Sequence, residues 1–138
     1  MIFVDSSAFY LLVNKNEKMH HLAKEAFHKF IYDNNELLLT SDYIIDETLT
    51  LISSRWGKYY AVTFWESISK SSILKLVKLT EKQFYKTVDL FIKYKDHKFS
   101  FTDCSSFVIM TDLKISKAFS FDKHFGEFGI EVLPSTRD

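Results

Sequence analysis

Short apolar runs alternate with longer amphipathic segments along this chain. Four of the runs predict buried strands, and a fifth would extend the sheet: residues 1–4, 37–39, 73–79, 118–121 and 130–133. Between them, apolar residues recur every three or four positions, as they do over residues 20–33, which predicts helices. Strands alternating with helices predict a parallel sheet of four to five strands with helices on both faces. The predicted fold class is therefore α/β.

Residues suited to helix ends support this division. Ser41 or Asp42 is a good N-cap for a helix that runs to about Trp56 and is closed by Gly57. Further helices are predicted over residues 58–72, 80–94 (opening with a Thr-Glu-Lys-Gln capping box) and 102–113, the last capped by Thr102.

Length and composition fit one compact domain over residues 1–138. The chain is 46% hydrophobic and has only three glycines and one proline, so no flexible linker divides it. Its longest run without a charged residue, 6–14, is far shorter than the roughly 20 apolar residues that a membrane-spanning helix needs. Asp5 interrupts the place of a secretory leader, and the lone Cys104 leaves no intramolecular disulfide. We therefore expect a cytoplasmic protein.

The charge balance argues against a protein that coats nucleic acid without regard to sequence. The 18 basic and 18 acidic side chains give zero net charge, whereas such proteins are strongly basic. If four carboxylates gathered in one pocket, 14 of the 18 acidic side chains would remain on the rest of the surface against 18 basic ones. A locally anionic and otherwise mildly basic molecule is therefore compatible with the sequence.

Four acidic residues occupy positions that a parallel sheet would bring together. Asp5 and Asp122 directly follow predicted strands, Glu47 lies in the helix after the second strand, and Asp103 lies in the first turn of the helix before the fourth. Sites in such sheets form outside the carboxyl ends of the strands. Converging carboxylates repel one another unless a cation neutralises them, and oxygen ligands favour Mg²⁺ or Mn²⁺. Each aspartate could instead serve only as a turn former or a helix cap.

Helix phase selects Glu47 over its neighbour Asp46. With 3.6 residues per turn, Glu47 lies about 40° from Leu51, at the border of the apolar arc of its helix. Asp46 points away from that arc. We therefore expect Glu47 to reach a pocket and Asp46 to face water.

Four blocks of sequence resemble the PIN-domain ribonucleases, and within them the VapC-like toxins. The blocks are FVDSSAFY at 3–10, DETL at 46–49, SFTDCSSF at 100–107 and AFSFDKHF at 118–125, followed by Gly129 and Leu133. They span nearly the whole chain in the order of the family. The resemblance implies a PIN-like three-layer α/β/α sandwich and assigns the family's acidic quartet to Asp5, Glu47, Asp103 and Asp122.

The resemblance also implies a function, a Mg²⁺- or Mn²⁺-dependent endoribonuclease that hydrolyses phosphodiester bonds in RNA. Asp5 and Asp103 would be direct metal ligands, and Glu47 and Asp122 would complete the shell or orient the attacking water. The family further suggests a toxin with a small antitoxin partner, and a homodimer. Two alternatives are an RNA-processing or RNA-binding protein with weak or no nuclease activity, and a receiver-type regulator. The second is disfavoured because the predicted strand at 37–39 ends without a phosphoacceptor aspartate.

Other side chains have two interpretations each. Ser6 and Ser7 could orient Asp5 or contact a phosphate, or they could cap the next helix. Arg55 precedes Trp56 in a segment whose cations and aromatic residues suit single-stranded RNA, or simply a packed helix end. Cys104 is better explained as a small apolar residue than as a nucleophile, since no histidine is placed to activate it.

Overall fold

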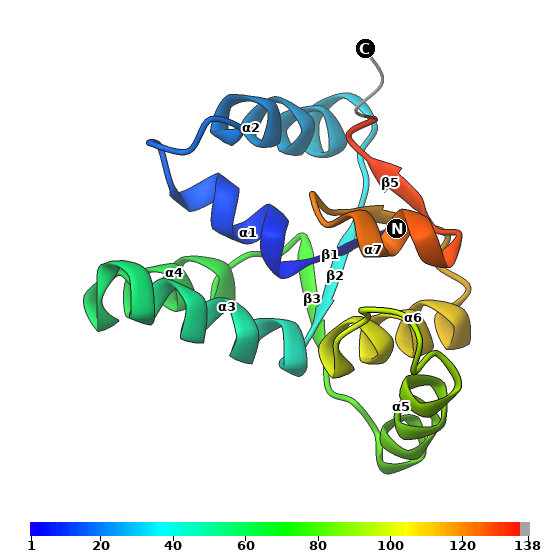
Figure 1. The fold of residues 1–138 in the computed structure, drawn as a ribbon. Coiled ribbons are helices and arrows are strands. Elements are labelled where there is room, and N and C mark those ends of the chain that lie inside the picture. Colours follow the sequence, from blue (N-terminus) through cyan, green and yellow to red (C-terminus); the bar gives the residue numbers. More distant parts are fainter. Residues whose placement is uncertain (136–138) are drawn as a thin grey trace.

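The computed structural model describes residues 1–135, and its centre is a five-stranded parallel sheet (Figure 1). The strands lie in the order β3-β2-β1-β4-β5, and every neighbouring pair is parallel. Their bounds are β1 Ile2–Val4, β2 Leu38–Ser41, β3 Leu74–Val77, β4 Lys117–Phe119 and β5 Glu131–Leu133. The predicted α/β class and parallel sheet are confirmed. The last three residues of the domain predicted over 1–138 lie outside the described residues.

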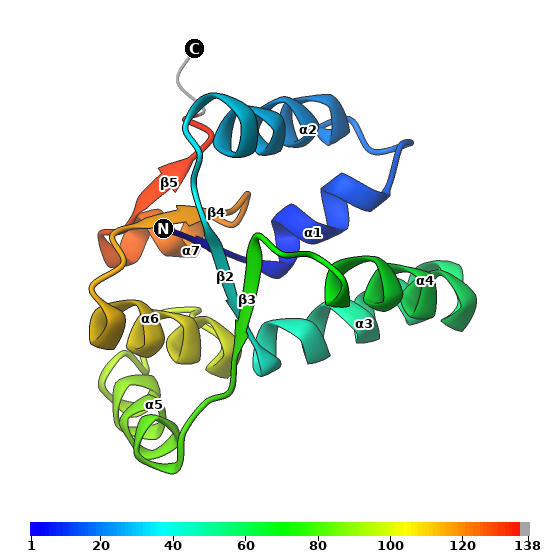
Figure 2. The ribbon, with the colours of Figure 1, turned by 180° about the vertical axis from the view of Figure 1, so that it is seen from behind.

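Helices cover both faces of the sheet. Figure 2 shows β3 at one edge, with α3 and α4 on one side and α5 and α6 on the other. Helices α1 to α4 pack together in the first layer, and α5 to α7 form the second. The helices are α1 Ser6–Val13, α2 His20–His28 with a π-helical extension Lys29–Asp33, α3 Asp42–Trp56, α4 Lys58–Ser69, α5 Glu81–Lys93, α6 Phe101–Leu113 and α7 Lys123–Phe128. No helix within residues 1–135 is both long and apolar enough to cross a membrane.

The central strand β1 is apolar throughout because both of its faces are covered. All three residues of β1 are at most 1% exposed, as expected for a strand between two helix layers. Phe3 and Phe107 are fully buried against the same ring, that of Phe125. Aromatic packing of this kind ties α6 and α7 to the sheet and fixes the position of the acidic residues at their first turns.

Most helix ends lie where the sequence predicts them. Ser41 caps α3 by accepting the Ile44 N–H, and the capping box of Thr80 and Gln83 is present at the start of α5. The predicted cap Thr102 is wrong, because Ser100 caps α6 and Thr102 lies inside the first turn. Ser100 is preferred because Asp103 stands three residues after it and completes a reciprocal capping box.

Candidate metal centre

The chain topology brings the four predicted acidic residues to one edge of the sheet. Asp5 follows β1 and Asp122 follows β4, and these two strands are neighbours. Glu47 lies in the second turn of α3, and Asp103 lies in the first turn of α6. The charges of Glu47 and Asp103 both act on Asp5, and those of Asp103 and Asp122 act on Glu47. All four carboxylates therefore share one electrostatic environment.

Asp5 is the most deeply buried of the four, with 2% of its surface exposed. Burial raises the pKa of its carboxyl group to about 6, and repulsion by Glu47 and Asp103 adds to this effect. The hydroxyls of Ser7 and Ser120 oppose it by donating hydrogen bonds of 2.7 and 2.9 Å to the same oxygen, Oδ2. No hydrogen bond from residues 1–135 reaches Oδ1. One oxygen is thus held by the protein while the other keeps its capacity for a ligand.

Two serines join the ends of β1 and β4. Ser7 accepts a hydrogen bond of 2.8 Å from the Phe121 N–H, and Ser120 accepts one of 3.0 Å from the Asp122 N–H. Of the interpretations left open for Ser7, the one in which it orients Asp5 matches its hydrogen bond to Oδ2. Ser120 was missed because a serine within an apolar run carries no distinctive signal. Its position between Phe119 and Phe121 in the last block, two residues before Asp122, is the only cue that the sequence offers.

Glu47 lies half-buried on the side of α3 that faces the site, whereas Asp46 is exposed. The direction predicted from helix phase is confirmed. Burial raises the pKa of Glu47, repulsion by Asp103 and Asp122 adds to it, and a hydrogen bond from Ser6 counteracts it. The Ser6 hydroxyl donates to Glu47 Oε1. Of the interpretations left open for Ser6, orienting Asp5 is excluded, because its side chain reaches across to Glu47 in α3 instead.

Asp103 and Asp122 each combine a structural role with a place in the site. Asp103 Oδ2 accepts the Ser100 N–H in the capping box, and Asp122 Oδ1 accepts the His124 N–H at the start of α7. Burial raises the pKa of Asp103, and the charge of Asp122 contributes. Helix capping and a site role were alternatives in the sequence, but the same carboxyl groups can serve both purposes.

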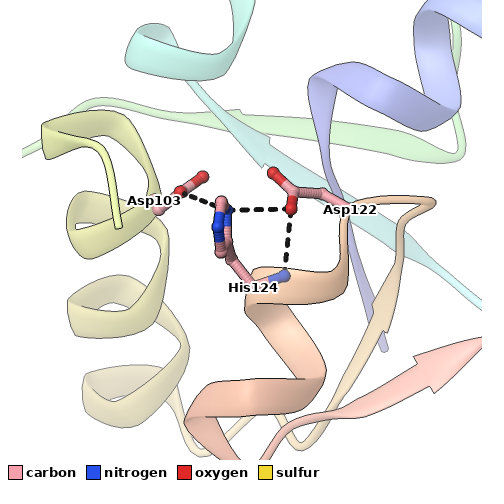
Figure 3. A group of neighbouring side chains, drawn as sticks. All are labelled: Asp103, Asp122 and His124. Carbon is pink, nitrogen blue, oxygen red and sulfur yellow. Dashed lines mark hydrogen bonds and ion pairs between the residues drawn. The ribbon is translucent and has the colours of Figure 1, made fainter. Parts of the chain in front are cut away.

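A histidine that the sequence did not single out lies between these two aspartates. Figure 3 shows His124 Nδ1 facing both carboxyl groups, 3.3 Å from Asp103 Oδ2 and 3.0 Å from Asp122 Oδ1. The nitrogen is buried and makes no hydrogen bond with residues 1–135. Asp103, Asp122 and His124 each offer one donor atom, and these atoms lie within 4.8 Å of one another, so the three side chains could hold a metal ion.

Arg55, the second candidate for substrate contact, lies away from this cluster. It is eight residues beyond Glu47 in α3, or about 12 Å along the helix axis. Its guanidinium lies 5.5 Å from the centre of the Tyr10 ring, and that ring stacks on Trp56. The packing corresponds to the helix-end interpretation, and a role of Arg55 in RNA contact stays a prediction.

Cys104 and a large apolar cavity are not part of the acidic cluster. Cys104 is buried, and burial raises the pKa of its thiol to about 11, so it is not ionised at neutral pH. A cavity of about 600 Å³ lies between α1, α3 and α4 and is mainly apolar, with Phe9, Trp56 and Phe64 among its lining residues. None of the four acidic residues lines it.

Comparison with known proteins agrees with this architecture. The PIN domain family matches residues 2–131. The 23S rRNA-specific endonuclease VapC20 of Mycobacterium tuberculosis is 29% identical over 135 residues, which cover 97% of this chain and 99% of VapC20. The crystal structure of VapC20, described as a Sarcin-Ricin loop cleaving toxin, superposes with a TM-score of 0.83 at 26% identity, covering 94% of this chain and 96% of that one.

A more distant structure shares the fold alone. VapBC2 from Rickettsia felis, bound to a DNA fragment from its promoter, superposes with a TM-score of 0.67 at 12% identity. The match covers 96% of this chain and 97% of the other. The predicted PIN-like three-layer sandwich is thus confirmed over nearly the full length of the chain.

Proposed function

The chain belongs to the PIN-domain family, and from that premise we propose that it is a metal-dependent endoribonuclease. The observation that carries the proposal is the convergence of Asp5, Glu47, Asp103 and Asp122, partly buried, at the carboxyl ends of β1 and β4. Such a cluster is costly without a cation, since burial and mutual repulsion both oppose ionisation. Similarity to VapC20, a 23S rRNA-specific endonuclease, supports RNA as the substrate.

In the proposed site, some side chains would bind the metal ion and others hold the ligands in place through hydrogen bonds. Asp5 and Asp103 would bind the ion directly, and Glu47 and Asp122 would complete the shell or orient the attacking water. A bound Mg²⁺ or Mn²⁺ would supply the Lewis-acid chemistry that activates water and neutralises charge on the phosphate. Ser7 and Ser120 hold Asp5, and Ser6 holds Glu47, so these carboxylates keep their orientation before substrate arrives. We also propose that Ser6 and Arg55 contact the RNA.

Removal of divalent cations should abolish RNA cleavage. We expect purified protein to cleave RNA with Mg²⁺ or Mn²⁺ and to lose that activity in excess EDTA, because without a cation the clustered carboxylates would repel the phosphate and its developing charge would not be neutralised. The products should carry 5′-phosphate and 3′-hydroxyl ends, since water and not the 2′-hydroxyl is the proposed nucleophile. Both points are measured by gel assay and end labelling. Full cleavage in EDTA, or cyclic phosphate ends, would refute the metal mechanism.

We propose a physiological role as the toxin of a toxin–antitoxin pair, with a small antitoxin as partner. The similarity to VapC20, described as a toxin, supports this role. Expression of the chain should arrest bacterial growth, and co-expression of an adjacent small gene should restore it. The alternative, an RNA-processing or RNA-binding protein with weak nuclease activity, predicts no growth arrest.

We also propose that the protein is a homodimer. Several large apolar or aromatic side chains are solvent-exposed on two helices, including Tyr59 of α4 (76% exposed) and Ile92 of α5 (60% exposed). Exposed apolar side chains of this size are candidates for contact surfaces between subunits. Light scattering at several concentrations should give twice the mass of the chain. A monomeric mass throughout would contradict the proposal.

A further inference from the structure

His124 Nδ1 lies among the carboxylates in an arrangement that ordinary ion pairing does not explain. A histidine that only neutralised the aspartates would direct a ring N–H at one of their oxygens. Nδ1 is within 3.0 Å of Asp122 Oδ1 and 3.3 Å of Asp103 Oδ2, yet it forms a hydrogen bond with neither. The in-plane direction of the nitrogen therefore does not run toward either oxygen.

We propose that His124 is itself a ligand of the bound metal, through Nδ1, together with Asp103 and Asp122. This inference rests on the metal site of the proposed function and adds a nitrogen to its oxygen ligands. Its consequence is metal selectivity: a mixed nitrogen and oxygen site binds Mn²⁺ more tightly than Mg²⁺.

The distances from His124 Nδ1 to the two carboxylate oxygens fit adjacent ligands of one ion. Two ligands of an octahedral ion, each about 2.1 Å from it, are about 3.0 Å apart when they are adjacent. The two distances from Nδ1 match that value closely, and all three donor atoms lie within 4.8 Å of one another. A ligand that points at such an ion makes an angle of about 45° with the direction to each neighbour, which explains the missing hydrogen bonds.

The fold holds the imidazole ring in this position. The backbone N–H of His124 donates to Asp122 Oδ1 over 2.9 Å, which fixes the start of α7 against one of the proposed ligands. The ring meets the Phe99 ring edge to face, with centroids 5.7 Å apart, and the side chain is only 19% exposed. A ligand that is oriented before the ion binds loses little conformational entropy on binding.

The chemistry of the donors sets the expected preference. Mg²⁺ is bound mainly by oxygen, whereas imidazole suits ions later in the first transition series. Mn²⁺ accepts both kinds of donor and gives an electron paramagnetic resonance signal. It is therefore the probe for the test.

The decisive measurement is electron spin echo modulation on the full chain loaded with Mn²⁺. The wild type should show nitrogen coupling to Mn²⁺, and this coupling should change to the ¹⁵N pattern when the histidines are labelled with ¹⁵N. His124→Gln should lose the coupling, whereas His21→Gln, a change at an exposed histidine of α2, should keep it. Calorimetry should show that His124→Gln weakens Mn²⁺ binding about tenfold or more and Mg²⁺ binding much less.

The outcomes separate this inference from the proposed function. Mn²⁺ bound without nitrogen coupling in the wild type would overturn the role of His124 and leave the nuclease proposal intact. Nitrogen coupling in a protein that cleaves no RNA would support the inference and contradict the nuclease. Absence of any Mn²⁺ binding would overturn both. Since the coupling is measured on the wild type, the result does not depend on the folding of the variant.

Discussion

Asp5→Asn should reduce RNA cleavage at least about a hundredfold while leaving the metal-free fold at pH 7.5 as stable as the wild type, or more stable. The loss of activity follows from removing a negative charge where the ion is proposed to bind. The fold should survive because Ser7 and Ser120 both donate to one oxygen of Asp5, and the amide oxygen of asparagine can accept both bonds. Asparagine is also an N-cap as good as aspartate for α1.

The direction of the stability change follows from the pKa of Asp5. Burial raises this pKa from 3.8 to about 6, so between these values the folded protein holds a proton that the unfolded chain releases. The contribution of protonated Asp5 to the free energy of unfolding is therefore fully present below about pH 4 and is lost as the pH rises through about 6. At pH 7.5 the buried charge costs on the order of 3 kcal/mol, and the variant avoids that cost.

Thermal unfolding in EDTA at pH 5 and pH 7.5 tests this expectation. The wild type should lose stability between the two values, and Asp5→Asn should lose less. Asp96→Asn makes the same chemical change at an exposed aspartate and should leave both stability and activity near the wild-type values. A clear fall in the melting temperature of Asp5→Asn at pH 7.5 would contradict the expected cost of the buried charge, and unchanged cleavage would contradict the role of Asp5 in the metal site.

Glu47→Gln should lower the cleavage rate by orders of magnitude, whereas Asp46→Asn should change it little. Glu47 faces the site, where its charge acts together with those of Asp103 and Asp122, and Asp46 is exposed on the other side of α3. Glutamine keeps an oxygen that can accept the hydrogen bond from Ser6, so the variant retains the local structure and loses only the charge.

Asp46→Asn is the matched control for Glu47→Gln, because both changes convert a carboxylate to an amide within one turn of α3. Initial rates with Mn²⁺ give the effect on function, and urea unfolding gives the effect on the fold. Asp46→Asn should shift the free energy of unfolding by no more than about 0.5 kcal/mol, as surface substitutions usually do. Equal losses of activity would mean that both carboxylates reach the site, and a loss at Asp46 alone would overturn the assignment.

The sequence predicts this site only as far as backbone periodicity and topology determine it. Asp5 and Asp122 follow apolar runs that become strands, and parallel neighbours end at the same edge of a sheet. Glu47 follows from the phase of its helix. These arguments need no knowledge of side-chain rotamers, and for that reason they locate the four acidic residues together.

The remaining parts depend on packing that periodicity does not encode. The short helices α1 and α7 follow Asp5 and Asp122 directly and carry no long apolar pattern of their own. The orientation of the His124 ring is determined by α7 and by its contact with the Phe99 ring, which belongs to the segment just before α6. Ser100 and Thr102 are equally plausible caps in isolation, and only the reciprocal bond with Asp103 separates them.

The helix caps have a consequence for relatives of this protein that have lost their activity. Asp5, Asp103 and Asp122 each accept a backbone N–H at the start of a helix, so selection for folding alone would tend to preserve them. Glu47 lies in the second turn of α3 and caps no helix. In a descendant under no pressure to cleave RNA, we expect Glu47 to be replaced first. Its presence is therefore a better sign of a working nuclease than that of the three aspartates.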